Sequence, residues 1–496
     1  MKRRKNDMEN LNKSFLDSID GKNLNFLIGA GASSSSLKTI TNNDKNEKGE
    51  KNIPSIENLF NKYENDEIAA ALLKFIFFSM SVKDGLITAY TERDNGATEA
   101  LKNYIAFINN IINLLNHTGF ERPKRANIFT TNYDTFFELA FDQIAHTYPL
   151  AYFNDGTRGF FTREISYENY FFNISHSGSM DTYRREIPSI NLYKMHGSLS
   201  WNKKAIDKDG IIISSNTNPV LDCLTKVKDK DAESFYEKVY KEINKFFTNL
   251  KKLVSSNSSK EAPKKDDIVI LSNTNPVLDC LTKAKDKDTE SFYEKVYKEI
   301  NKFFTNLKKL VSSNSSEETL DKVTEEDLLI HFECLLTKLK ETESETESES
   351  EINPSTSLAE TLSKDLLKFE EIYDELLIVN PTKKKFEETV FEEQYYQLFR
   401  AFEEELQKPN SVLIVFGFSF KDKHINDILK RCLTNPTLQV FVVPYNEDDE
   451  KKVKEKFTGY GNISFMKKED ESKNNIKYKH GDFDVLNGFL SGKNDI

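Results

Sequence analysis

The 496-residue chain has few cysteines, no long apolar run and no excess of basic residues. Its four cysteines are far apart and form no Cys-x-x-Cys pair, so no disulfide framework and no zinc cluster are expected. No run of about 18 apolar residues predicts a transmembrane helix, and the basic start Met1–Lys5 is not followed by an apolar signal core. The net charge of −11 argues against direct sequence-specific nucleic-acid binding. We therefore expect a reducing, cytoplasmic location without a membrane partner.

The chain does contain 37 Phe and 20 Tyr, enough aromatic side chains to fill a core. Its most informative feature is an apolar run, Leu24–Ile28, that leads into Gly29-Ala30-Gly31-Ala32-Ser33. This pattern is typical of a first strand that turns into a helix, where glycine lets the backbone approach a phosphate. The third glycine of Gly-x-Gly-x-x-Gly is missing, so a purely structural glycine turn is an equal alternative.

Further apolar runs end in small or polar residues and alternate with helical patterns. The segment 126–131 leads into Asn132-Tyr133-Asp134, and 190–195 leads into His196-Gly197. Later strands are predicted at 376–379, before Asn380, at 411–416, before Gly417-Phe418-Ser419, and at 438–444. The alternation predicts an α/β fold, a Rossmann-like doubly wound parallel sheet with helical insertions. Ligands of such sheets bind at the carboxyl ends of the strands. Each residue also has a structural interpretation: Asn132 as a helix cap, His196 as a core histidine.

The chain divides by composition into four parts. We expect an N-terminal arm at 1–20, a first part of the Rossmann-like domain at 21–210 with a helical insert at about 55–118, and a second part at 357–496. Between them, 211–356 contains a near-identical repeat, 215–259 and 272–316, followed by an acidic linker at 341–356. Two copies that differ at two positions indicate a recent tandem duplication, either a tolerated surface insertion or a new binding surface.

The order of the strand-end motifs resembles the sirtuin family. Sirtuins carry a Gly-Ala-Gly-x-Ser turn, a Thr-Gln-Asn-x-Asp motif, a His-Gly motif and a Gly-Thr-Ser turn. The counterparts in this chain are Gly29–Ser33, Thr130–Asp134, His196-Gly197 and Gly417–Ser419. The chain departs from sirtuin deacylases in two ways: it lacks their four-cysteine zinc module, and Thr131 stands where they have Gln.

The resemblance implies that NAD+ is the ligand, and because the four-cysteine module is missing, no zinc is expected. It assigns Asn132 to the nicotinamide ribose and a water, and His196 to the role of general base. The residues it assigns to cofactor binding are Gly29, Ala30, Gly31, Ser33, Thr131, Asp134, Asn380, Gly417 and Ser419. His424 follows the last glycine turn on a predicted helix, where a helix-face or interface role is expected.

The segments His196–Trp201, Asn380–Phe386 and Gly417–Ile425 resemble more closely the bacterial sirtuin-like proteins of anti-phage defence, which hydrolyse NAD+. In particular, the chain looks like the sirtuin-like subunit that works with a HerA-type ATPase, and the resemblance implies a homo-oligomer. The expected function is thus an NAD+ hydrolase that depletes NAD+. Two alternatives stay open: an NAD-dependent protein deacylase or ADP-ribosyltransferase, and a non-catalytic sensor that binds NAD or ADP-ribose.

Overall fold

The fold is taken from a computed structural model of the chain. It describes residues 15–35, 37, 56–82, 85, 95–117, 119, 124–148, 150–159, 163–179, 184–203, 211–213, 332, 336, 367, 369–370, 373–374, 376–380, 393–467, 469–470, 477–478 and 480–492. Both copies of the repeat and the acidic linker lie outside these residues. No helix in the described part of the chain is long and apolar enough to cross a membrane.

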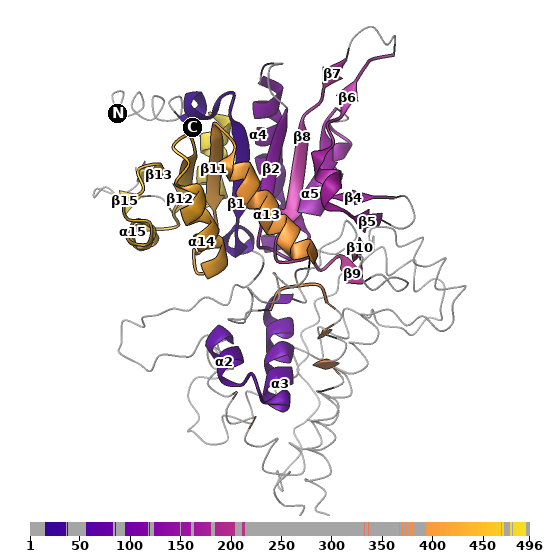
Figure 1. The fold of residues 1–496 in the computed structure, drawn as a ribbon, viewed down its shortest axis with the longest axis vertical. Coiled ribbons are helices and arrows are strands. Elements are labelled where there is room, and N and C mark those ends of the chain that lie inside the picture. The colour runs from indigo at the N-terminus through magenta and orange to yellow at the C-terminus, as the bar shows by residue number, and fades with distance from the viewer. Residues whose placement is uncertain are drawn as a thin grey trace, which may run out of the picture.

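A parallel sheet of seven strands forms the centre of the fold (Figure 1). Its order is β13-β12-β11-β1-β2-β8-β3, and every neighbouring pair is parallel. In chain order the strands are β1 (Asn23–Ile28), β2 (Arg125–Thr130), β3 (Tyr152–Asn154), β8 (Ser189–Lys194), β11 (Ser411–Phe416), β12 (Gln439–Val443) and β13 (Ile463–Phe465). The predicted Rossmann-like α/β class is therefore confirmed.

Helices cover both faces of the sheet because neighbouring residues of each strand point to opposite sides. On β1, Phe26 and Ile28 join one core, whereas Leu27 joins the other. The first core packs against α4 (Asn95–His117), α5 (Phe136–Ala145) and α16 (Phe483–Ser491). The second packs against α13 (Glu393–Gln407), α14 (Lys423–Cys432) and α15 (Glu447–Lys456).

A separate cluster of helical residues lies beyond the carboxyl ends of the strands (Figure 1). It contains α2 (Ile56–Lys62), α3 (Glu67–Phe77) and the π-helical turn η2 (Phe78–Val82). The cluster reaches the sheet through Leu199, which follows β8, and through the edge-on contact of Phe77 with Tyr133. Of the segment 55–118, only α2, α3 and η2 form this cluster, because α4 lies on the sheet.

Short strands complete the described fold. The strands β4 (Thr157–Arg158), β5 (Arg163–Ile165), β9 (Trp201–Lys203) and β10 (Ile211–Ile213) form a small antiparallel sheet. Two ribbons pair β6 (Ser175–His176) with β7 (Arg185–Glu186), and β14 (Glu469–Asp470) with β15 (Lys477–Tyr478). The prediction of a strand at 376–379 is wrong: within this segment only Ile378 pairs, in a single antiparallel bridge with Gly197. Its partner Gly197 lies past the end of β8, so the segment stays outside the main sheet.

Four asparagines cross the sheet in a buried row that the sequence analysis did not predict. Asn25, Asn127, Asn191 and Asn154 are in register on β1, β2, β8 and β3. Each amide nitrogen donates to the next oxygen: Asn127 to Asn25 at 2.9 Å, Asn191 to Asn127 at 3.0 Å and Asn154 to Asn191 at 3.0 Å. A one-residue slip of any of these strands would leave buried amides unpaired, so the row favours this register.

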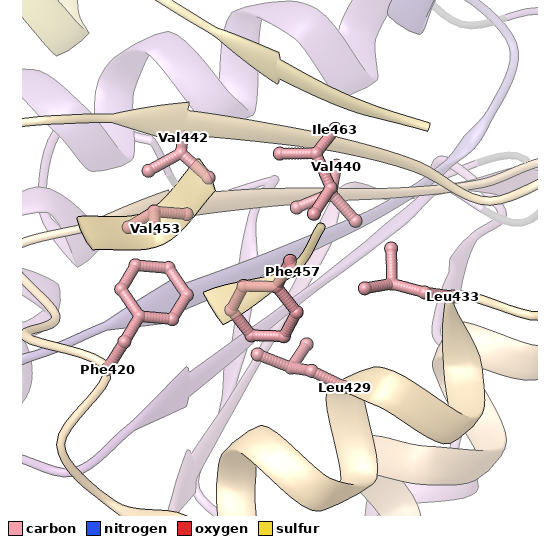
Figure 2. Close-up of a pocket in the computed structure, with 8 residues that line it drawn as sticks. All are labelled: Phe420, Leu429, Leu433, Val440, Val442, Val453, Phe457 and Ile463. Carbon is pink, nitrogen blue, oxygen red and sulfur yellow. The ribbon is translucent and has the colours of Figure 1, made fainter. Parts of the chain in front are cut away.

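Between β12, α14 and α15 lies a small gap lined only by apolar side chains (Figure 2). Its volume of about 10 Å³ is close to the space of a single water. Its lining includes Phe420, Leu429 and Phe457, which offer no polar group to a ligand. The gap is a packing defect of the core, and the functional site must be sought elsewhere.

Candidate functional site at the carboxyl ends of the strands

The sheet changes direction between β1 and β11. From β1 the chain continues to β2, then to the edge strand β3 and back to β8 between them, and it then places β11 on the other side of β1. The connections after β1 and β11 therefore leave in opposite directions, and this is the point where doubly wound sheets have their ligand crevice, outside the carboxyl ends of the strands. Both glycine turns singled out in the sequence, Gly29–Ser33 and Gly417–Ser419, lie at this point.

The two glycine turns pack against each other, backbone to backbone. Gly417 has a φ of +65°, and a Cβ there would lie 2.5 Å from the amide nitrogen of Ala32. A Cβ on Gly29 would lie 2.5 Å from the carbonyl oxygen of Gly417. The amide of Gly31 donates to that same oxygen at 2.9 Å. These glycines are thus required by contact between the turns, and the Gly31 amide is already used within the protein.

The helix predicted after the first turn is shorter than the dinucleotide pattern suggests. The residues Ala30–Ser33 form a single 3₁₀ turn, η1, and no α-helix follows directly in the described residues. A helix of this length has little macrodipole to offer an anion. Ala30 and Gly31 are exposed at the crevice, whereas Ser33 is buried and points into the protein. Ser33 therefore contacts neighbouring side chains of the protein.

Ser33 joins a buried group of polar side chains from three elements. Its hydroxyl donates to Asp134 Oδ2 at 2.8 Å and lies 2.7 Å from the Tyr104 hydroxyl of α4. The side-chain nitrogen of Asn132 lies 3.3 Å from Ser33 Oγ and 3.4 Å from the Tyr104 oxygen. Asn132 follows β2, and its backbone amide is held by Thr130 Oγ1 at 3.0 Å. The structure thus brings together Ser33, Asn132 and Asp134, which the sequence placed in one site.

Asn132 is only 4% exposed, and its carbonyl oxygen Oδ1 has no hydrogen-bond partner among the described residues. A buried amide oxygen without a partner is costly, and native proteins rarely leave one. The oxygen therefore has acceptor capacity that no described residue uses, which suits a ligand hydroxyl or a water that reaches it. A merely capping role for Asn132 would not leave this oxygen unpaired.

Asp134 is a buried carboxyl, 3% exposed, whose oxygens accept from Ser33 and from the backbone amide of Phe136 at 3.2 Å. Burial raises its pKa above the ordinary value, and the nearby Lys194 and the Ser33 hydrogen bond oppose the rise. The Lys194 ammonium donates to the Asp134 carbonyl and to Glu138 at 2.7 Å. These contacts of Lys194 hold the loop after β2 in place.

His196 follows β8, the neighbour of β2, so parallel strands about 4.8 Å apart carry it and Asn132 to the same edge. Its loop is fixed by the bridge between Gly197 and Ile378 and by the Val379 amide, which donates to the His196 oxygen at 2.9 Å. Gly197 has a φ of +82°, and a Cβ there would lie 1.9 Å from the Leu377 oxygen. Glycine is therefore obligatory after the histidine.

The imidazole of His196 is 6% exposed and meets a second histidine. Its Nε2 lies 3.4 Å from Nε2 of His424, at the start of α14, and Phe399 packs edge-on against the His424 ring. Two nitrogens at this distance form a hydrogen bond only if one carries the proton and the other accepts it. The pair can therefore hold one proton between the two rings.

The remaining predicted residues are placed as follows. Thr131 is half-buried beside β1, and its amide donates to the Ile28 oxygen at 3.2 Å. Asn380 lies just past the bridge to Gly197, where its Oδ1 accepts from Tyr373 at 2.7 Å. Ser419 is exposed at the end of the second glycine turn. Asn380 thus follows the segment that contacts His196 and Gly197, past the end of β8.

The sequence did not point to Tyr104, and it predicted a different role for His424. In the sequence, Tyr104 fits the pattern of an apolar position on a helix. Only the packing of α4 on the sheet brings its hydroxyl to Ser33. His424 was expected on a helix face, although its spacing after Gly417-Phe418-Ser419 was the available signal. Within the residues that the structure describes, no three His, Cys, Asp or Glu side chains gather as a metal site.

A search of curated proteins found no match to the chain. A family model, however, matches residues 126–260, which include Asn132, Asp134 and His196 but neither glycine turn. That model describes the SIR2-like domain, and over a little more than a quarter of its length the chain is therefore similar to SIR2-like domains.

Proposed function

We propose that the chain is an NAD+ hydrolase that cleaves the bond between nicotinamide and ribose. The unpaired, buried Oδ1 of Asn132 beside the crevice carries this proposal. A dinucleotide suits the crevice between β1 and β11, and SIR2-like domains bind NAD+. An amide oxygen is suited to a ribose hydroxyl or a water, because it accepts a hydrogen bond without adding charge.

The reaction consumes one NAD+ and one water and yields nicotinamide, ADP-ribose and a proton. The bond between C1′ of the ribose and the nicotinamide nitrogen breaks, and its electron pair leaves with the neutral nicotinamide. Water then bonds to C1′ and gives up a proton. Asn132 Oδ1 would hold the ribose or this water, and His196 would accept the proton, since an imidazole titrates near neutral pH.

The pair of histidines gives the accepted proton a further route. His424 lies within 3.4 Å of His196 Nε2, so a proton taken by one ring can be passed to the other. The Ala30 and Gly31 backbone, exposed at the crevice, would face the pyrophosphate, with Ser419 on the opposite turn. We further propose a role in anti-phage defence, as a homo-oligomer with a HerA-type ATPase; this part rests on the sequence resemblance alone.

The test is nicotinamide release from NAD+ by the purified chain, followed by chromatography. We expect release that is lost in Asn132→Ala and in His196→Ala, and retained in His176→Ala, a matched control at an exposed histidine of β6. Release that depends on an acyl-lysine peptide would indicate a deacylase instead. NAD+ that binds but stays intact, both with purified protein and in expressing cells challenged with phage, would indicate a sensor.

A further inference from the structure

Tyr104 is held in place by its ring, independently of its hydroxyl. It is fully buried on α4, stacked on Phe136 with ring centres 5.4 Å apart, and edge-on to Phe137 at 4.7 Å. This packing delivers the hydroxyl to Ser33 Oγ, at 2.7 Å, at the inner end of the site. Burial raises the pKa of Tyr104 well above its ordinary value, so the hydroxyl keeps its proton.

The direction of every hydrogen bond in this group follows from counting protons. The Ser33 hydroxyl donates its single proton to Asp134 Oδ2 at 2.8 Å. Ser33 then has none left to give, and the short contact with Tyr104 requires the phenol to donate to Ser33. Both hydroxyl oxygens are left as acceptors toward Asn132.

Those two oxygens decide which way the Asn132 amide points. With its nitrogen inward, the amide donates to Ser33 at 3.3 Å and to Tyr104 at 3.4 Å. Rotated by half a turn, it would direct Oδ1 at two oxygens that have no proton to give, and the NH₂ group would face the crevice. The observed rotamer, with Oδ1 unpaired, is therefore the one that the group selects.

We propose that Tyr104 is a positioning residue that holds Asn132 with its carbonyl oxygen toward the ligand, by donating to Ser33 and accepting from the Asn132 amide. This inference rests on the proposed function for its effect on catalysis, but not for its effect on the amide. Tyr104→Phe keeps the ring packing and removes one acceptor from the amide nitrogen and one donor from Ser33. The rotated amide then no longer faces the phenol oxygen, and Asn132 populates both orientations.

A double-mutant cycle separates positioning from simple destabilisation. We expect Tyr104→Phe to lower kcat for nicotinamide release about tenfold, and to have no further effect on the residual rate of Asn132→Ala. Tyr170→Phe is the matched control, because that buried hydroxyl also makes two hydrogen bonds, to the Asp155 and Leu192 oxygens, away from the site. It should lower the unfolding midpoint and leave kcat unchanged. Equal effects of Tyr104→Phe in both Asn132 backgrounds would overturn the proposal.

A second readout does not require turnover. In protein labelled with ¹⁵N-asparagine, the side-chain NH₂ signals of Asn132 are identified by their loss in Asn132→Ala. We expect Tyr104→Phe to shift these signals and to speed their exchange with solvent, and Tyr170→Phe to leave them in place. Unchanged signals in Tyr104→Phe would refute the positioning role. Shifted signals in a protein that never cleaves NAD+ would uphold it while contradicting the proposed hydrolase.

Discussion

Asp134→Asn should reverse the hydrogen bonds of the site while barely changing its shape. In the native protein Oδ1 of Asp134 accepts from the Phe136 amide and Oδ2 accepts from Ser33 at 2.8 Å. The variant has one oxygen and one NH₂ group. If the oxygen stays on the Phe136 amide, the NH₂ donates to Ser33, whose proton must turn toward Tyr104 or Asn132. If the side chain rotates instead, two donors face each other, at a cost of about 1–3 kcal/mol.

With the Ser33 proton turned inward, either Ser33 or Tyr104 presents a proton to Asn132, so the amide is favoured with Oδ1 inward. The oxygen that would hold the ribose or the water is then lost to the ligand. Removing one such preorganised hydrogen-bonding group costs about 10²–10³ in rate, roughly 3–4 kcal/mol of transition-state stabilisation. We therefore expect kcat/KM for NAD+ to fall by about that factor in Asp134→Asn, measured as nicotinamide release.

Stability should respond in a different way, which separates the two effects. Burial raises the pKa of Asp134, so the folded protein binds its proton more tightly than the unfolded chain does. The stability that this proton contributes is present below the unfolded pKa of about 3.9 and is lost as pH rises through the raised folded pKa. Relative to Asp134→Asn, the native protein should lose unfolding free energy as pH rises above about 4.

Urea unfolding at several pH values between about 4 and 8 checks this, with Trp201 as the probe, since it is the single tryptophan and is buried. The rate and the pH dependence of stability are tested independently. A rate near that of the native protein in Asp134→Asn would refute the reversal of the hydrogen bonds. A stability difference that does not change with pH would refute the cost that we assign to the buried carboxylate.

Three further predictions concern the sheet, the glycine turn and the second histidine. Asn127→Leu leaves the Asn25 oxygen without a donor, so we expect a loss of about 2–4 kcal/mol in unfolding free energy. When Asn25→Leu is added, the total loss should be smaller than the sum of the losses of the two single variants. Additive losses in urea titrations would contradict this. Gly417→Ala places an alanine at a positive φ and brings its Cβ into overlap with Ala32. The variant should bind NAD+ more weakly in calorimetry and lose at least about 1–2 kcal/mol of unfolding free energy. Unchanged affinity would contradict the packing of the turns. His424→Ala removes the imidazole partner of His196, the proposed general base, so nicotinamide release should slow about tenfold or more. An unchanged rate would exclude the pair from catalysis.

Much of the fold could be predicted because parallel strands leave a strong local signal. Buried strands appear in a sequence as continuous apolar runs. Five predicted runs are strands of the sheet to within one residue at either end: 24–28, 126–131, 190–195, 411–416 and 438–444. The run at 376–379 has the same local pattern but forms only a bridge. Its sequence does not record that the segment lies opposite Gly197, past the end of β8 and outside the main sheet.

The chain by itself determined which residues lie at the strand ends, because small and polar residues must follow a buried strand where the backbone leaves the core. Asn132, Asp134, His196 and Gly417 could be singled out in this way. Only the tertiary structure decided what each of them touches. Tyr104 and His424 come from helices distant in sequence, and they enter the site because those helices pack on opposite faces of the sheet. Hydrogen-bond direction depends on all partners at once, so the orientation of Asn132 emerges only when the chain is folded.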